Sequence, residues 1–142
     1  MRIKAVHVAG LAAALMGGVA KDALADTTVS NSTTTPLLTS SAGNITLDSN
    51  GKITVTAGQT AITVDSNNNV ANGGSIGSTA ADNTTGILLG NGASGTISNT
   101  SIITLAEPSP LSDTDGDGDL DGPWATGSNR FGILLNAGST FT

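Results

Sequence analysis

The chain contains no cysteine and very few aromatic residues, and both absences limit the ways in which it can be held together. Disulfide bonds are excluded, so a folded form has to rely on packing, on a bound metal or on further chain. One Trp and two Phe among 142 residues, with no Tyr, are too few for the aromatic-rich core of a compact globular domain. The apolar residues are mainly Ile, Val, Leu and Ala, diluted by Gly, Thr, Ser and Asn. This composition is typical either of disorder or of a thin, repetitive β-structure.

Positive charges are scarce beyond the first 25 residues. Of the 11 acidic residues only Asp22 lies in that stretch, whereas three of the five basic residues do. This leaves ten acids against Lys52 and Arg130, and a net charge of −8. Nucleic acids and anionic membrane surfaces bind clustered Lys and Arg. We therefore expect neither of them as a partner.

Residues 1–25 have the pattern of a cleavable secretion signal, which is expected to form a short helix. Arg2 and Lys4 give a positive start, an apolar run of about 16 residues follows, and Ala23–Ala25 provides the small-x-small site that signal peptidases cut. A membrane anchor is the alternative, but a spanning helix needs roughly 20 apolar residues. The pattern predicts export through the inner membrane, with Asp26 as the first residue of the mature protein.

From residue 44 onward, aliphatic residues alternate with threonine, which is the period-2 pattern of β-strands. Clusters of Asn, Gly, Asp and Ser separate the strands and predict turns. No stretch after residue 25 has helical spacing over three turns. The sequence predicts an all-β fold, preceded by a Ser/Thr/Asn-rich extended segment at 26–43 with little structure of its own. The clearest strand triplets are Ile45–Leu47, Ile53–Val55, Ile62–Val64 and Ile103–Leu105.

A longer repeat is superimposed on these strands. Ala61–Ile62, Gly86–Leu89 and Gly132–Leu135 look like one strand position on successive rungs, with spacings of 25 and 46 residues. The second spacing is 21 residues longer than the first, which is the length of the acidic, proline-containing stretch at 107–127. A constant period with a loop inserted into one coil predicts a right-handed parallel β-helix, a solenoid, over residues 44–142. A β-sandwich is the alternative, but it has no reason to keep a 25-residue register.

In such a solenoid, asparagines at the turns stack in hydrogen-bonded ladders and aliphatic side chains point inward. Three or four coils are marginal on their own, and the chain stops at Phe141–Thr142 just as another rung begins. We therefore expect an incomplete solenoid and a fragment of a longer protein. The residues expected to point inward are Ile45, Leu47, Ile53, Val55, Ile62, Val64, Ile87, Leu89, Ile103, Leu105, Ile133 and Leu135.

The run from Asp113 to Gly122 is the most specific motif in the sequence. Counting Asp113 as position 1, carboxylates fall at positions 1, 3, 5 and 9, and Gly118 at position 6 permits a sharp turn. Alternate acids on a tight loop suit calcium, which takes six to eight oxygen ligands. The run resembles EF-hand-like and thrombospondin-type-3 calcium loops. Calcium is therefore the expected cofactor, with ligands from Asp113, Asp115, Asp117, Asp119 and Asp121.

The motif departs from the EF-hand pattern at position 12, where Trp124 replaces the bidentate Glu. Asp121 or a carboxylate from elsewhere, such as Glu107, has to complete the shell, so a modest affinity is expected. Leu120 is expected to anchor the loop on the apolar body. The alternative interpretation is a solvated acidic loop without a metal. Calcium is favoured because five carboxylates within nine residues repel one another in the absence of a cation.

The secretion signal, the Ser/Thr/Asn-rich start, repeats such as Thr60–Ser66 and Thr85–Leu89, and the acidic insert followed by Gly127–Ile133 resemble the passenger domain of a Gram-negative autotransporter. The resemblance extends over the whole chain. It implies a β-helical region that is displayed at the cell surface or secreted, with a C-terminal outer-membrane β-barrel in the full-length protein. Such passengers are often adhesins, so it also implies a host or cell-surface glycan or protein as a partner.

A β-helical polysaccharide lyase or hydrolase is the alternative function, because that group is similar in architecture and in calcium use. Acid–base chemistry on sugars needs a positioned base and charge stabilisers. After residue 25 the chain has no His or Tyr, a single Glu, one Lys and one Arg. Arg130 is expected to be a salt-bridge partner. No catalytic residue is therefore expected within these 142 residues, and an active site outside the fragment stays open.

Overall fold

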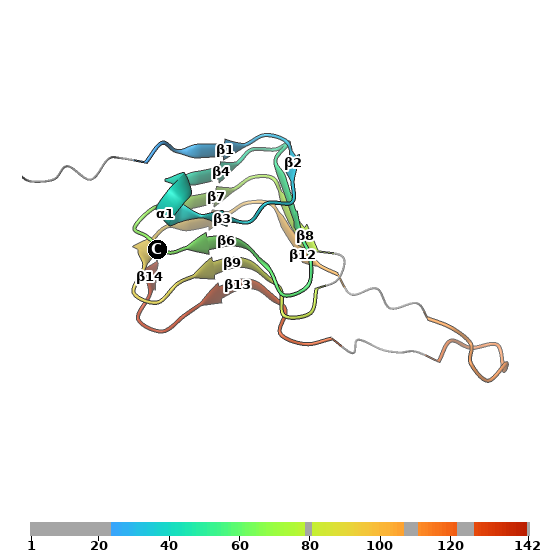
Figure 1. Ribbon diagram of the computed structural model, residues 1–142. Helices are drawn as coiled ribbons and strands as arrows, with labels where there is room; N and C mark the ends of the chain where they lie inside the picture. The colour runs from blue at the N-terminus through green and yellow to red at the C-terminus, as the bar shows by residue number, and fades with distance from the viewer. Residues whose placement is uncertain (1–23, 79–80, 107–110, 122–126, 142) are drawn as a thin grey trace, which may run out of the picture.

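The computed structural model describes residues 24–78, 81–106, 111–121 and 127–141 (Figure 1). The expected secretion signal lies outside these ranges, apart from its last two residues. The described part is all-β, with parallel sheets and one short helix, and none of its helices is long and apolar enough to cross a membrane. The elements are β1 (Thr27–Val29), β2 (Ser32–Thr33), β3 (Leu37–Leu38), α1 (Thr39–Ala42), β4 (Ile45–Leu47), β5 (Lys52–Val55), β6 (Thr60–Val64), β7 (Val70–Asn72), β8 (Ser75–Ser78), β9 (Thr85–Leu89), β10 (Ser94–Gly95), β11 (Ile97–Asn99), β12 (Ile102–Leu105), β13 (Phe131–Leu135) and β14 (Thr140–Phe141).

Three four-stranded parallel sheets make up the body, and a fourth, two-stranded sheet pairs β10 with β14. Sheet A has the strand order β1-β4-β7-β11, sheet B the order β2-β5-β8-β12, and sheet C the order β3-β6-β9-β13. The chain visits A, B and C in turn and then returns to A. We call each passage through the three sheets a circuit. Successive circuits lie one on another, as Figure 1 shows.

The repeat predicted from the sequence is confirmed in sheet C. Ile62 of β6 pairs with Ile87 of β9, which pairs with Ile133 of β13, so the two steps are 25 and 46 residues. Ser94 and Thr140, in the two-stranded sheet, are also 46 residues apart. The additional residues of the longer step therefore leave the pairing of β9 with β13 in register.

Aliphatic side chains from all three sheets fill the interior. Four of the twelve residues expected to point inward lie on the outermost strands, β12 and β13: Ile103 and Leu105 are half-buried, whereas Ile133 and Leu135 are 39% and 41% exposed. No strand of the described chain covers that end of sheets B and C, so these side chains contact the core from one side only. The other eight are buried: Ile45, Leu47, Ile53, Val55, Ile62, Val64, Ile87 and Leu89.

The segment at 26–43 is more ordered than predicted, and the expectation of little structure there is wrong. It forms β1, β2, β3 and α1 and completes the first circuit, with Thr27 paired to Ile45. Strands β7 and β8 were not expected either, although they place Val70 and Ile76 in the core. In each case backbone pairing to a neighbouring circuit forms the strand, and most of the side chains are too small or too polar to form an aliphatic repeat.

Asparagine side chains connect successive circuits where the chain enters and leaves sheet A. The side-chain oxygen of Asn44 accepts a hydrogen bond of 2.8 Å from the Asn69 amide, and that of Asn69 accepts one of 2.8 Å from the Thr96 amide. At the other end of the strands, Asn72 Nδ2 donates to Asn99 Oδ1 at 2.7 Å. The expected ladders of asparagine are therefore present, and they satisfy backbone groups at the turns.

Asp65 fixes the short helix α1 to the second circuit. Its carboxylate accepts hydrogen bonds of 2.7 and 2.6 Å from the amide and hydroxyl of Ser40, and one of 3.2 Å from the hydroxyl of buried Thr39. Burial by itself raises the pKa of Asp65, but these hydrogen bonds outweigh it and hold the pKa below its ordinary value of 3.8. The folded protein therefore favours the ionised form of Asp65, and ionisation of this carboxyl group stabilises the fold.

Ile87 and Ile133 offer a matched test of the core, because they share a column of sheet C but differ in burial. Ile87→Ala removes a fully buried side chain and should lower the free energy of unfolding by about 2–5 kcal/mol. Ile133→Ala truncates a side chain that is 39% exposed, so we expect roughly half that loss or less. Chemical denaturation measures both. Equal losses would contradict the placement of Ile87 in the core.

Asp65→Ala should lower the free energy of unfolding at neutral pH by about 1 kcal/mol, as for the loss of a helix cap. Because the pKa of the folded state is lowered, the stabilisation is present above the ordinary pKa of 3.8 and is lost as the pH falls below it. Thermal unfolding at decreasing pH should show the two proteins converge in acid. Asp119→Ala, measured in chelator, is the control, because no described residue donates a hydrogen bond to that carboxylate. A difference that persists in acid would show that the charge of Asp65 is not responsible.

Candidate metal centre

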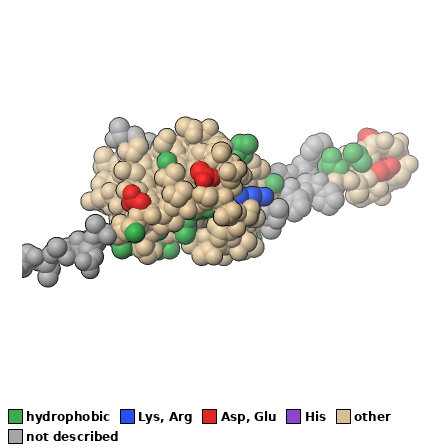
Figure 2. Space-filling model, turned by 90° about the horizontal axis from the view of Figure 1, so that it is seen from above, with side chains coloured by type: hydrophobic (Ala, Val, Ile, Leu, Met, Phe, Trp, Pro, Cys, Tyr) green, Lys and Arg blue, Asp and Glu red, His purple; other side chains and the backbone are tan. Residues whose placement is uncertain are grey.

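The acidic insert leaves the body between β12, which ends at Leu105, and β13, which begins at Phe131. Of the insert predicted at 107–127, the structure describes residues 111–121 and Gly127. The loop at 111–121 lies apart from the stacked sheets (Figure 1), and Figure 2 shows acidic side chains gathered at its end. Every residue from 111 to 120 is exposed. Any binding site in this loop therefore has to be formed by the residues of the loop itself.

Hydrogen bonds to Asp121 close the loop on itself. The amide and hydroxyl of Thr114 donate to the Asp121 carboxylate at 2.8 and 2.6 Å, and the Asp121 amide donates to the Ser112 carbonyl at 3.1 Å. The Thr114 hydroxyl is the main reason that the pKa of Asp121 lies below its ordinary value. These contacts bring the two ends of the acidic run together.

Three carboxylates converge inside the closed loop. Asp113, Asp115 and Asp117 each offer one oxygen, and these oxygens all lie within 4.8 Å of one another. Asp113 is held from both sides, because its two oxygens accept hydrogen bonds of 2.5 Å from the Gly116 amide and 3.0 Å from the Gly118 amide. Both glycines have positive φ angles, +81° and +92°, which L side chains rarely adopt. The turns therefore need glycine at these two positions.

The geometry of these three oxygens fits one hard cation. Calcium binds oxygens at about 2.3–2.6 Å, so two ligands of one ion lie at most roughly 5 Å apart. The 4.8 Å limit of the cluster is within that range. An all-oxygen donor set suits calcium or magnesium, whereas zinc prefers nitrogen and sulfur ligands.

The structure supports part of the predicted ligand set. Asp119 and Asp121 do not belong to the cluster of three carboxylates, and Asp121 is engaged by Thr114 instead. Leu120 is 56% exposed, so the expectation that it anchors the loop on the apolar body is wrong. Glu107 and Trp124, the two residues that bear on completing the shell, lie outside the described residues.

The C-terminal base of the insert is held to the third circuit by Asp82. Its carboxylate accepts hydrogen bonds of 3.0 Å from the Ser128 amide and 3.0 Å from Arg130 Nη2, which confirms the salt-bridge role expected for Arg130. Beside this contact, Asn129 Nδ2 donates to Asn83 Oδ1 at 2.9 Å. Asn83 and Asn129 have φ angles of +54° and +56°, so the two turns share one unusual conformation.

These contacts restore the register before β13 begins. Asn83 and Asn129 are 46 residues apart, which is the same step that separates β9 from β13. Gly127 allows the close approach, because a Cβ atom there would collide with the Arg130 guanidinium and the Asp82 carboxylate. The contacts of Asp82, Asn83 and Asn129 were not predicted from the sequence. The 46-residue spacing of two Asn residues just before a repeated strand is the signal that could have identified them.

Comparison with known proteins adds no assignment for this site. No protein-family model, no curated protein and no solved structure matches the chain. Only the fold and the acidic loop therefore bear on the function of the chain.

Proposed function

We propose that the chain is a non-enzymatic passenger region of an exported protein, displayed at the cell surface or secreted, in which a right-handed parallel β-helix forms a stalk. In this proposal the acidic insert binds calcium for structural support. The observation that carries it is the sheet C register, in which Ile62, Ile87 and Ile133 stay aligned across steps of 25 and 46 residues.

The sheet topology supports the β-helix. Each strand of sheets A, B and C pairs in parallel with the equivalent strand of the next circuit, and the chain passes through the three sheets in the same order each time. The connection between two parallel strands of one sheet is right-handed in about 98% of cases, because the strands themselves have a right-handed twist. A stack of this kind extends by adding circuits, which suits a stalk.

The insert supports a structural role for the metal. A loop that leaves the stack and returns in register does not have to pack against the sheets, so only its own contacts can order it. Asp113, Asp115 and Asp117 repel one another at close range, and a cation between them removes that repulsion. Calcium bound here would therefore make the loop rigid without changing the body.

Calcium titration of the full chain tests the proposed metal site. Calorimetry should give a dissociation constant of about 0.1–1 mM, the range of extracellular calcium modules. Asp113→Asn removes charge from the carboxylate that the amides of Gly116 and Gly118 position, and should weaken binding by about tenfold or more. Asp48→Asn is the matched control, since it changes an acid at a turn of the body that makes no contact with the insert among the described residues, and should keep the affinity. If about 10 mM calcium produces neither heat nor a thermal shift, the site is not a calcium site.

Export is tested by the N-terminus of the secreted form. Expression in a Gram-negative host should yield a product whose sequence begins at Asp26, because Ala23–Ala25 is a signal peptidase site. Ala25→Arg places a large, charged residue at that site and should block cleavage, whereas Ala12→Val, in the apolar run, should not. N-terminal sequencing of cell fractions distinguishes the outcomes. An uncut chain that stays in the inner membrane would indicate an anchor instead.

A further inference from the structure

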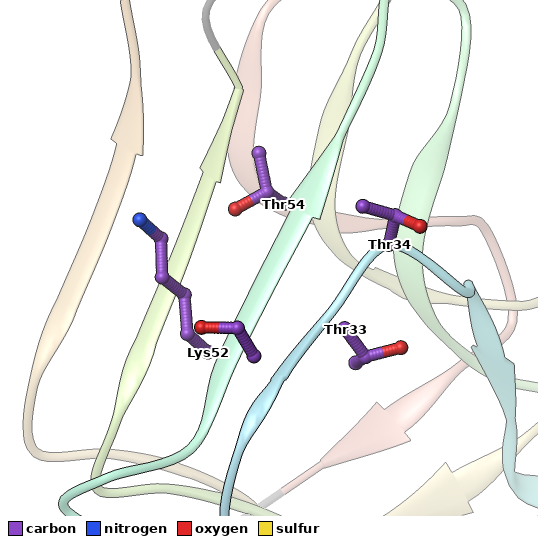
Figure 3. A pocket seen from close by; sticks show the side chains of 5 residues that line it. Thr33, Thr34, Lys52 and Thr54 are labelled. Atoms are coloured by element: carbon purple, nitrogen blue, oxygen red, sulfur yellow. The ribbon is translucent and has the colours of Figure 1, made fainter.

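The outer face of sheet B carries a polar depression that is separate from the acidic insert (Figure 3). It has a volume of about 420 Å³ and is lined by Ser32, Thr33, Thr34, Lys52 and Thr54. The volume falls in the range of roughly 300–1,000 Å³ that small-ligand sites occupy. Most such sites are apolar, whereas each residue that lines this depression carries a hydroxyl or an ammonium group beside its methyl or methylene carbons. A ligand with several hydrogen-bonding groups suits this lining.

Strands β2 and β5 present these groups on one rigid surface. Lys52 and Thr54 are two residues apart in β5, so their side chains leave the same face of the strand. Ser32 pairs with Lys52 across the sheet, and Thr34 follows directly after β2. Figure 3 shows Lys52 and Thr54 projecting from β5, with Thr34 on the neighbouring segment. The paired strands therefore fix the backbone positions from which Ser32, Lys52 and Thr54 project.

The face stays open beside the depression. The partner of Thr54 on the next strand is Gly77, which has no side chain, and the partner of Lys52 is Ser75, which has a short one. Further along the same rows lie Thr104 and Ile102. An extended ligand can therefore run from β2 towards β12 across a surface that carries the hydroxyls of Ser75 and Thr104 and the exposed side chain of Ile102.

Four of the five polar groups of the depression are available for a ligand, whereas the Thr33 hydroxyl accepts a hydrogen bond of 3.1 Å from the Thr35 amide. Within the described ranges, the carboxylates make no ion pair with Lys52, and the side chains of Ser32, Thr34 and Thr54 have no hydrogen-bond partner. Asp48, the acid closest to Lys52 in the sequence, accepts hydrogen bonds of 2.8 and 3.0 Å from the amides of Asn50 and Gly51 instead. Lys52 is the only charged group in the lining, so the depression favours an anion.

The single lysine also limits the charge of that anion. A lone ammonium is a compact point charge that balances the single charge of one carboxylate, whereas a phosphate monoester carries a charge of about −1.5 to −2 at neutral pH. The net charge of −8 beyond residue 25 repels strongly polyanionic ligands as well. The hydroxyls of Ser32, Thr34 and Thr54 both donate and accept, which matches the hydroxyls of a sugar.

We propose that this depression binds an acidic saccharide, with the carboxylate of a uronate unit on the Lys52 ammonium and its hydroxyls on the serine and threonine hydroxyls of β2 and β5. The site goes beyond the proposed calcium-supported stalk and does not involve the insert. In this proposal the saccharide binds to the outer face of sheet B, and the metal binds to the projecting loop.

The test is a calorimetric titration of the full chain with a uronate disaccharide, its methyl ester and the neutral disaccharide, all in excess chelator. The acid should bind at least about tenfold more tightly than the ester or the neutral sugar, because only the acid makes a charge-assisted hydrogen bond. Its affinity should also fall as salt is added. Lys52→Gln should abolish this preference and Lys52→Arg should retain it. Both changes are at an exposed position, so circular dichroism should show an unchanged fold.

Three results would overturn the proposal. One is equal binding of the acid and the neutral sugar. Another is a preference for the acid that survives in Lys52→Gln, which would place the carboxylate elsewhere. The third is inorganic phosphate displacing the uronate at equal concentration, which would identify a general anion site and not a saccharide site. Since the chelator removes calcium throughout, these outcomes are independent of the metal site in the insert.

Discussion

Parallel backbone pairing, in register from one circuit to the next, is the constraint on which the rest of the structure depends. It places like side chains above one another, so that Ile62 and Ile87 are buried in one column and Asn44 and Asn69 form a ladder at one turn. Aliphatic columns remove apolar surface from water, and the ladders satisfy turn amides. With no disulfide and few aromatic residues, this repetition replaces the large side chains that hold together an ordinary core.

The same constraint explains how an acidic insert is tolerated in a small body. Only the first and last residues of an inserted segment have to contact the stacked strands. On the C-terminal side of this insert, the hydrogen bonds of Asp82 with Ser128 and Arg130 provide that contact. Between its ends the segment is free to adopt a local fold. The body and the insert can therefore serve different purposes. The outer face of sheet B is formed by the stacked strands, whereas the oxygen cluster of Asp113, Asp115 and Asp117 is formed by turns within the loop.

Sequence patterns predicted the features that repeat or that follow from local spacing. The Ile62, Ile87 and Ile133 register was visible because aliphatic side chains recur at fixed steps, and the convergence of Asp113 with Asp115 and Asp117 followed from alternate acids on a glycine-containing turn. Strands β1 and β2 were missed because their mostly polar side chains carry no burial signal when backbone pairing forms the strand, and β3, Leu37–Leu38, is too short to show an alternating pattern. Asp121 lies outside the carboxylate cluster because its carboxylate accepts a hydrogen bond from the Thr114 hydroxyl. The polar face around Lys52 arises from the residues that pair across β2 and β5. Neither can be derived from spacing.

The central claim is that β9 and β13 are direct neighbours although 46 residues separate paired positions such as Leu88 and Leu134. Because the protein has no cysteine, a double variant, Leu88→Cys with Leu134→Cys, gives a clean distance measurement. Paired strands lie about 4.8 Å apart, within the roughly 4.4–6.8 Å between Cα atoms that a disulfide bond spans. Mild oxidation should therefore cross-link this pair rapidly. The control pair, Leu88→Cys with Ser98→Cys, joins sheet C to sheet A and should stay reduced. If the first pair cross-links no faster than the control, β9 and β13 are not neighbours and the stacked architecture is wrong.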